Sequence, residues 1–160
     1  MGFRIGQGID FHRLSSGLNL ILGGIHIPSE KGCVAHSDGD VLIHSICDAL
    51  LGAAGLEDIG HQFPDTDPRF KGIDSKKLLE KTFILLEENG YMVVNVDSTV
   101  CLEKPKIAQY IREMKNVLAP ILKIAPGDIG IKATTTEKMG FTGREEGVVA
   151  ISVALITAKG

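Results

Sequence analysis

Hydrophobic and polar residues alternate or recur at helical spacing over most of the chain, and this pattern predicts its secondary structure. Residues 3–9 have a short strand pattern. Residues 18–27 have a hairpin pattern, in which Gly23 and Gly24 supply a turn at positive φ. Strands are also predicted in three later segments rich in β-branched residues, at 91–102, 129–134 and 148–157.

Three helices are predicted from the cap and stop signals that flank segments of helical spacing. Ser37 or Asp38 is expected to cap the first helix, which runs to about residue 54. Ser75 is expected to cap the second, over residues 76–89. The third is expected to carry Pro105 in its first turn and to reach about residue 122.

The order of these elements predicts an α+β fold in one domain, residues 1–160, because strands and helices are mixed without regular βαβ alternation. The expected architecture is a mixed β-sheet with helices packed on one face. The last predicted strand is apolar at nearly every position, and such a strand requires burial on both of its sides. Self-association is therefore expected to cover the second face of the sheet.

Composition narrows the functional class. Aromatic residues make up 5% of the 160 residues, Trp is absent, and the formal net charge is −3. These values disfavour base stacking on single-stranded nucleic acid and a basic surface for a duplex, so no nucleic-acid partner is expected. Any bound phosphate must then be held by local groups or by metal ions.

Cysteine usage and hydropathy bear on the compartment. Cys33, Cys47 and Cys101 are widely spaced and form no CxxC pair, which favours a reducing environment over a disulfide framework. No stretch approaches the ~18–20 apolar residues of a membrane span, so no membrane partner is expected. The chain is expected to be cytoplasmic in a bacterium, or to lie in an organelle stroma if a transit segment has been removed.

Two segments carry residues typical of a metal site. Asp10 and His12 stand two positions apart in an extended segment, so their side chains point the same way. With His44 on the first predicted helix they would make two imidazoles and one carboxylate, a set that suits catalytic zinc with one open position. Asp40 or Asp48, one helical turn to either side of His44, could orient its ring. Each segment alone also fits a hydrogen-bonded turn or a solvated helix face.

Two loops add candidate substrate contacts. Residues 58–68 are dense in Gly, Pro and Asp, which indicates turns; functionally, their acceptors could bind sugar hydroxyls while Lys71 meets a phosphate. His61 is interpreted as a surface residue of this loop. Residues 132–144 place three consecutive Thr beside Glu137, which fits either strand propensity or a phosphate cradle with a ligand for magnesium. The GxxxxGK[ST] phosphate loop is absent from the sequence.

Four motifs resemble, in the same order, those of the 2-C-methyl-D-erythritol 2,4-cyclodiphosphate synthase family. They are Gly-x-Asp-x-His at 8–12, His-Ser-Asp-Gly-Asp at 36–40, Phe-Pro-Asp-Thr-Asp at 63–67 and Lys-Ala-Thr-Thr-Thr-Glu-Lys at 132–138. The resemblance covers residues 4–158. It implies a metal-dependent phosphorus–oxygen lyase of isoprenoid biosynthesis, which converts 4-diphosphocytidyl-2-C-methyl-D-erythritol 2-phosphate to the 2,4-cyclodiphosphate and releases CMP.

The resemblance also implies roles for individual residues. It implies Zn²⁺ bound by Asp10, His12 and His44, and Mg²⁺ or Mn²⁺ held by Glu137 together with the substrate phosphates. His36 and Thr135 match catalytic positions that stabilise the transition state. The substrate-binding candidates, with Lys71 and Thr136 taken from the loops above, are Ser37, Asp58, Gly60, Asp65, Lys71, Leu102, Lys106, Ala133, Thr134, Thr136, Phe141 and Arg144.

The same resemblance implies a homotrimer with sheet faces packed together and active sites between subunits. An axial cavity near Phe141 and Arg144 would hold an isoprenoid diphosphate. Glu103 departs from the small neutral residue expected in the cytidine pocket formed by residues 102–108 and 133–135. Two alternative functions stay open: a zinc phosphohydrolase, and a non-catalytic trimeric module that binds isoprenoid phosphates or metal.

Overall fold

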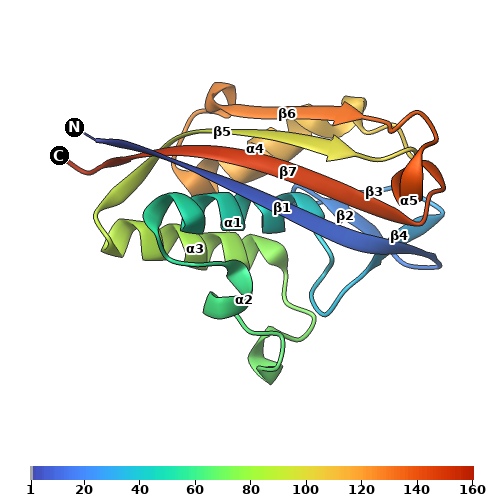
Figure 1. The fold of residues 1–160 in the computed structure, drawn as a ribbon, viewed down its shortest axis with the longest axis horizontal. Helices are drawn as coiled ribbons and strands as arrows, with labels where there is room; N and C mark the ends of the chain where they lie inside the picture. Colours follow the sequence, from blue (N-terminus) through green and yellow to red (C-terminus); the bar gives the residue numbers. More distant parts are fainter. Residues whose placement is uncertain (1) are drawn as a thin grey trace.

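Five strands form one mixed sheet in the computed structural model, which describes residues 2–160 (Figure 1). All neighbouring strands are antiparallel except β5 and β6, which run parallel. In spatial order the strands are β4 (Lys31–Val34), β1 (Phe3–Ser16), β7 (Gly147–Ala158), β5 (Tyr91–Cys101) and β6 (Ile129–Thr134).

The predicted hairpin is confirmed as a separate two-stranded sheet, β2 (Leu20–Leu22) and β3 (Ile25–Ile27). Its turn residues, Gly23 and Gly24, have φ of 59° and 78°, in the region that glycine adopts without steric cost. The three strands predicted in the second half of the chain are confirmed as β5, β6 and β7. The short strand β4 was not predicted.

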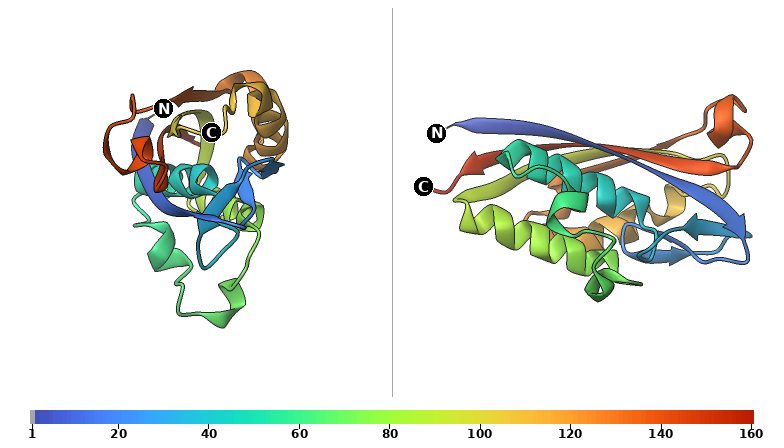
Figure 2. Two further views of the ribbon diagram at one scale, coloured as in Figure 1. Left: turned by 90° about the vertical axis from the view of Figure 1, so that its right-hand side faces the viewer. Right: turned by 60° about the horizontal axis from the view of Figure 1, so that its bottom comes forward.

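Three long helices lie on the same side of the sheet, as both views of Figure 2 show. They are α1 (Val41–Ala54), α3 (Ser75–Glu88) and α4 (Ile111–Leu122). The chain also forms the short helices α2 (Ile59–Gln62) and α5 (Gly140–Gly143), and single 3-10 turns at Pro68–Phe70, Ala108–Tyr110 and Pro126–Asp128. The predicted α+β class with a mixed sheet is therefore confirmed. Across residues 2–160, no helix has the length and apolar character needed to cross a membrane.

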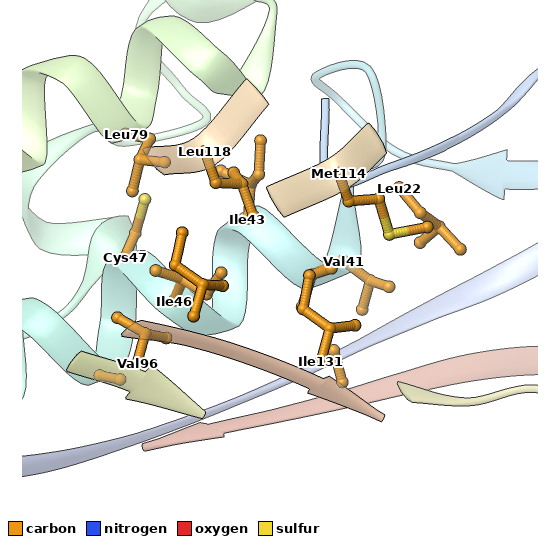
Figure 3. Close-up of a cluster of buried hydrophobic side chains, with 14 of the residues drawn as sticks. Leu22, Val41, Ile43, Ile46, Cys47, Leu79, Val96, Met114, Leu118 and Ile131 are labelled. Atoms are coloured by element: carbon orange, nitrogen blue, oxygen red, sulfur yellow. The ribbon is translucent and has the colours of Figure 1, made fainter. Parts of the chain in front are cut away.

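The helix α1 is the centre of the core, and most of its side chains are buried. Figure 3 shows its Ile43 and Ile46 between α4 on one side and the sheet on the other. Its backbone also lies directly against β1: a Cβ at Gly6 would lie 2.0 Å from the carbonyl oxygen of Ala49, and one at Gly8 would lie 2.0 Å from that of Ser45. Glycine at these two positions is what allows α1 to approach the strand so closely.

The opposite face of the sheet carries exposed apolar side chains. Along β1 the odd-numbered positions point away from the helices, and Phe3 and Ile5 are 65% and 71% exposed. Ile9 and Phe11 on β1 and Val153 on β7 extend this surface. A sheet face with this many large apolar residues is unusual for an isolated monomer, so the expectation of self-association stays a prediction with structural support.

Two boundaries around α1 differ from the prediction. The strand β1 continues beyond residue 9 to Ser16, because it pairs with β7 as far as Arg13 and with β4 from Arg13 onward. Asp40, rather than Ser37 or Asp38, caps α1: its side chain accepts a hydrogen bond from the amide of Ile43 at 3.0 Å. Asp10 and His12, which follow the strand predicted over residues 3–9, therefore lie inside β1.

The starts of the other two long helices also differ. Ser75 is the first residue of α3 and Asp74 is its cap, accepting from the amide of Lys76 at 2.9 Å. The third helix begins at Ile111 and not near Pro105. The segment before it forms a loop and then the 3-10 turn Ala108–Tyr110; Leu102 donates its amide to the carbonyl of Thr134, and Ile107 is buried.

Candidate active site

Asp10, His12 and His44 converge at one point between β1 and α1. The carboxylate oxygen Oδ2 of Asp10 lies 3.0 Å from Nδ1 of His12 and 3.1 Å from Nδ1 of His44. The three possible ligand atoms all lie within 4.8 Å of one another. The alternation of β1 turns Asp10 and His12 toward the helices, and the close approach of α1 brings His44 to meet them.

The far side of the His44 ring is held by two serine hydroxyls. Nε2 of His44 lies 2.9 Å from Oγ of Ser75 and 3.3 Å from Oγ of Ser37. Ser75 in turn donates its hydroxyl and its backbone amide to Asp38. The cap region of α3 therefore fixes the ring of His44, an arrangement common around metal-binding imidazoles.

The sequence interpretation assigned this supporting role to Asp40 or Asp48, and the structure corrects it. Asp40 is fully buried and accepts from the amides of Gly23, Gly24 and Ile43. Asp48 accepts from the amide of Ile59 at 2.8 Å. Neither carboxylate contacts His44. No local motif joins Ser75 to His44, so their pairing could be found only from the fold.

The electrostatics of the cluster suit a bound cation. Burial raises the pKa of Asp10, but the two imidazoles outweigh burial and lower its pKa to about 2, so the carboxylate is ionised. Nδ1 of His12 is buried and lies 3.0 Å from Oδ2 of Asp10 outside hydrogen-bond geometry, and it has no hydrogen-bond partner among residues 2–160. A cation bound between the two atoms would satisfy both of them. Two imidazole nitrogens and one carboxylate oxygen match the usual donor set of catalytic zinc, and the residues therefore fit a metal ion.

A pocket of about 300 Å³, called the metal-side pocket below, opens beside this cluster. Its lining includes His36 and Ser37 from the segment before α1, and Gly60 and Asp65 from α2 and the loop after it. Four of the predicted site residues are thus brought together with His12 and His44. Asp58 instead caps α2, accepting from the amide of His61 at 2.8 Å. Lys71 is exposed at the end of the 3-10 turn and is not part of the pocket wall. His61 is exposed, as expected of a surface residue.

A second pocket of about 160 Å³, called the strand-end pocket below, lies at the ends of β5 and β6. The predicted meeting of residues 102–108 with residues 133–135 occurs here. Its wall is formed by Leu102, Pro105, Lys106, Ile107, Ala108, Ala133, Thr134 and Thr135. Next to it, the hydroxyl of Thr135 donates to Oε1 of Glu137 at 3.2 Å. The hydroxyl of Thr136 points elsewhere and bonds the carbonyl of Met139 and the hydroxyl of Thr142.

Phe141 and Arg144 lie in a third and larger hollow, of about 550 Å³, beside the first strand. The ring of Phe141 lies 6.2 Å from that of Phe11, centroid to centroid. Arg144 pairs with Glu146 at 2.9 Å. This hollow shares His12 with the metal-side pocket but contains none of the other predicted metal ligands.

The metal-side pocket and the strand-end pocket are separate within one chain. They have no wall residue in common among residues 2–160. In the sheet, Phe11 pairs with Val149, Val149 with Cys101, and Cys101 with Thr134. Three strand spacings therefore separate β1 from β6, which amounts to about 14 Å.

The fold and the site together define a class: an α+β protein with one helix-covered sheet and the donor set of a metal-assisted enzyme. The chain belongs to the YgbB family, whose family model matches residues 3–157. It is 55% identical to a 2-C-methyl-D-erythritol 2,4-cyclodiphosphate synthase of Geobacillus thermodenitrificans, over 96% of each chain.

Solved structures agree with this assignment. A CDP complex of IspF from Plasmodium falciparum superposes with a TM-score of 0.87 at 33% identity, covering 99% of this chain and 98% of that one. The bifunctional IspDF of Campylobacter jejuni superposes with a TM-score of 0.94 at 41% identity. The match covers 98% of this chain but 42% of the longer Campylobacter protein.

Proposed function

We propose that this chain converts 4-diphosphocytidyl-2-C-methyl-D-erythritol 2-phosphate to 2-C-methyl-D-erythritol 2,4-cyclodiphosphate and CMP. The name of the relative at 55% identity supports this reaction. Within the chain, the convergence of Asp10, His12 and His44 carries the proposal, because two imidazoles and one carboxylate whose ligand atoms lie within 4.8 Å of one another are a donor set that suits a catalytic metal ion.

The reaction needs no nucleophile from the protein. An oxygen of the substrate's 2-phosphate forms a bond to the β-phosphorus, and the bond from that phosphorus to the oxygen bridging to the α-phosphate breaks. The bridging oxygen keeps the electron pair and leaves with CMP. Holding both reacting groups in one rotamer can contribute about 7–11 kcal/mol in favourable cases, so positioning is the chain's main task.

The strand-end pocket suits the cytidine phosphate end of the substrate. Residues from the segments 102–108 and 133–135 line it, and Lys106 supplies a positive charge for phosphate. Thr135 would donate its hydroxyl to a phosphate oxygen as negative charge shifts during the reaction. Glu137, which that hydroxyl now contacts, is placed to hold Mg²⁺ or Mn²⁺ against the diphosphate.

The metal-side pocket suits the other end of the substrate. Gly60 and Asp65 line this pocket and would accept hydrogen bonds from the hydroxyls of an erythritol chain, and His36 and Ser37, which line it too, would contact the 2-phosphate. Asp10, His12 and His44 would hold Zn²⁺, which when bound neutralises phosphate charge. Asp58 and Lys71 stay candidates that would reach the substrate from outside the pocket wall.

A substrate of this length must contact both pockets, and one chain keeps them apart. We therefore extend the proposal to a homotrimer in which the metal-side pocket of one subunit faces the strand-end pocket of the next. The exposed apolar face of β1 and β7 supports such an assembly, because its burial would stabilise the contact. The hollow at Phe141 and Arg144, with apolar rings beside a guanidinium, is a candidate for an isoprenoid diphosphate on the trimer axis.

Phosphorus NMR of the reaction tests the activity. Purified protein with Mg²⁺ and the proposed substrate should yield CMP and one cyclic diphosphate, and a chelator should abolish the turnover. Release of inorganic phosphate would instead favour the zinc phosphohydrolase. Binding of metal without any turnover would favour the non-catalytic module.

Subunit mixing tests the shared site. His44→Ala removes a proposed zinc ligand from the metal-side pocket, and Glu137→Gln removes the proposed ligand for Mg²⁺ or Mn²⁺ beside the strand-end pocket. Each variant alone should therefore be inactive. If the subunits are unfolded and refolded together in equal amounts, most trimers are mixed, and each mixed trimer has one site with both intact sides. About a quarter of wild-type activity should return. Activity that stays at zero in the mixture, while refolded wild type is active, would place each site within a single chain.

A further inference from the structure

Glu103 lies two residues after the end of β5, in the loop whose residues line the strand-end pocket. Its Oε1 accepts hydrogen bonds from the backbone amides of Thr136 and Lys138, at 3.1 and 3.2 Å. These two amides stand on either side of Glu137 in the sequence. One carboxylate oxygen thus holds the turn that carries the proposed diphosphate-side ligand.

This turn is one that the backbone does not favour by itself. Glu137 and Lys138 have φ of 53° and 63°, in the left-handed region that residues with a Cβ adopt at a cost. Such conformations persist only when the surroundings fix them. Backbone amides that point at one spot form a site for an anionic oxygen, and here the oxygen comes from Glu103.

Hydrogen bonds within the turn support it locally: the amide of Glu137 donates to the hydroxyl of Thr135 at 3.3 Å, and the amide of Met139 donates to the carbonyl of Thr136 at 2.9 Å. The hydroxyl of Thr136 bonds the carbonyl of Met139 at 2.7 Å and the hydroxyl of Thr142 at 2.9 Å. All of these partners lie within residues 135–142, whereas Glu103 ties the turn to the loop after β5. Lys104, next to Glu103, pairs with Glu145 at 3.0 Å. The loop after β5 is therefore joined to both ends of the segment from Thr136 to Glu145.

We propose that Glu103 is a positioning residue, whose carboxylate holds the turn at residues 135–138 so that Thr135 and Glu137 face the diphosphate before substrate arrives. The assignment of Thr135 and Glu137 to the diphosphate rests on the proposed function. The departure from a small neutral residue at position 103 is then no disturbance of the nucleotide pocket. It is the connection between that pocket and the diphosphate side.

Three variants separate this role from general stability. Glu103→Leu removes the acceptor and keeps an apolar stem of similar size. Glu103→Gln keeps one side-chain oxygen that can accept both amides. Glu80→Leu is the matched control, because Glu80 on α3 is exposed and its side chain forms no hydrogen bond or ion pair with other residues in the range 2–160.

Hydrogen exchange of the ligand-free protein is the first measurement. Glu103→Leu should speed amide exchange in the segment 136–138 by roughly tenfold or more, because losing the carboxylate lowers the free energy needed to open the turn locally. Glu103→Gln and Glu80→Leu should exchange at the wild-type rate in that segment. Wild-type protection in Glu103→Leu would overturn the proposal, whatever the enzyme's substrate is.

Binding of CDP and CMP, each with and without Mg²⁺, is the second measurement. Wild type should bind CDP more tightly when Mg²⁺ is present. In Glu103→Leu, the factor by which Mg²⁺ tightens CDP binding should be roughly tenfold smaller than in wild type, while CMP binding should be unchanged. Glu103→Gln should restore the wild-type factor. An unchanged gain in Glu103→Leu would overturn the role at the diphosphate. A wild-type protein that turns over no substrate would refute the proposed function, and the exchange result would still decide whether Glu103 holds the turn.

Discussion

Adding one methyl group to Gly8 tests whether contact between α1 and β1 assembles the metal-side pocket. A Cβ at this position would lie 2.0 Å from the carbonyl oxygen of Ser45 and 2.6 Å from the amide nitrogen of Ala49, where ordinary contact begins at 3.4 Å. Both atoms belong to the backbone of a buried helix, so neither can move by a change of rotamer. In Gly8→Ala the helix must withdraw from the strand by about 1.4 Å at this point.

The expected loss of stability follows from that displacement. Overpacking a well-packed core costs about 1–3 kcal/mol, and a clash between two backbones belongs at the upper end of that range. For a chain of this length, 3 kcal/mol corresponds to a fall in melting temperature of roughly 6–12 °C. Because His44 moves with α1 while Asp10 and His12 stay on β1, zinc affinity should fall as well.

Gly52→Ala is the matched control in the same helix. A Cβ there would meet only the carbonyl oxygen of Gln7, at 3.9 Å, so the methyl group has room. Replacing a helical Gly by Ala should raise stability by up to about 1 kcal/mol. Urea unfolding at one fixed protein concentration measures both variants, and competition with a chromophoric chelator measures zinc. If Gly8→Ala unfolds at the wild-type urea concentration and binds zinc with wild-type affinity, the account of this contact is wrong.

Three further predictions address single groups. Ser75→Ala should lower zinc affinity by about 10–100-fold and leave the fold intact, because it frees Nε2 of His44; unchanged affinity in the chelator competition would exclude the role of Ser75. Burial raises the pKa of Asp40 to about 6, so the folded chain holds its proton more tightly than the unfolded chain. The free energy of unfolding should therefore fall as the pH rises from about 4 to about 6. Asp40→Asn should flatten this pH dependence, which urea titrations at each pH measure. Ile5→Asp places a charge on the exposed apolar face and should shift sedimentation toward the monomer, while a variant that sediments as wild type would exclude this face from the assembly.

Much of the fold follows from patterns that lie within a few residues of each other. The Gly23-Gly24 turn, the apolar helix before Gly55 and the β-branched strands each carry their signal locally, and all three were predicted. The beginnings of the helices were less predictable. Ser37, Asp38 and Asp40 all have cap-forming side chains, and which one caps α1 depends on contacts with α3 and with the hairpin.

The site shows the same division. Asp10, His12 and His44 could be grouped from the sequence, because donor type and strand alternation restrict what they can bind. The roles of Ser75 and Glu103 could not, since each acts on residues about 30 positions away through a contact that only the fold creates. Ser75 was interpreted only as a helix cap, and Glu103 only as an unexpected charge.

The two faces of β1 join the chemistry to the proposed assembly. Even-numbered positions carry Gly8, Asp10 and His12 toward α1, whereas odd-numbered positions carry Ile5 and Phe11 to the open face. A shift of β1 by one residue would exchange these faces and remove the metal ligands and the apolar surface together. Pairing with β7 over eleven residues opposes such a shift. Substitutions that act on one face should therefore separate metal binding from association, as Gly8→Ala and Ile5→Asp are designed to do, whereas a change that disturbs the register of β1 should impair both.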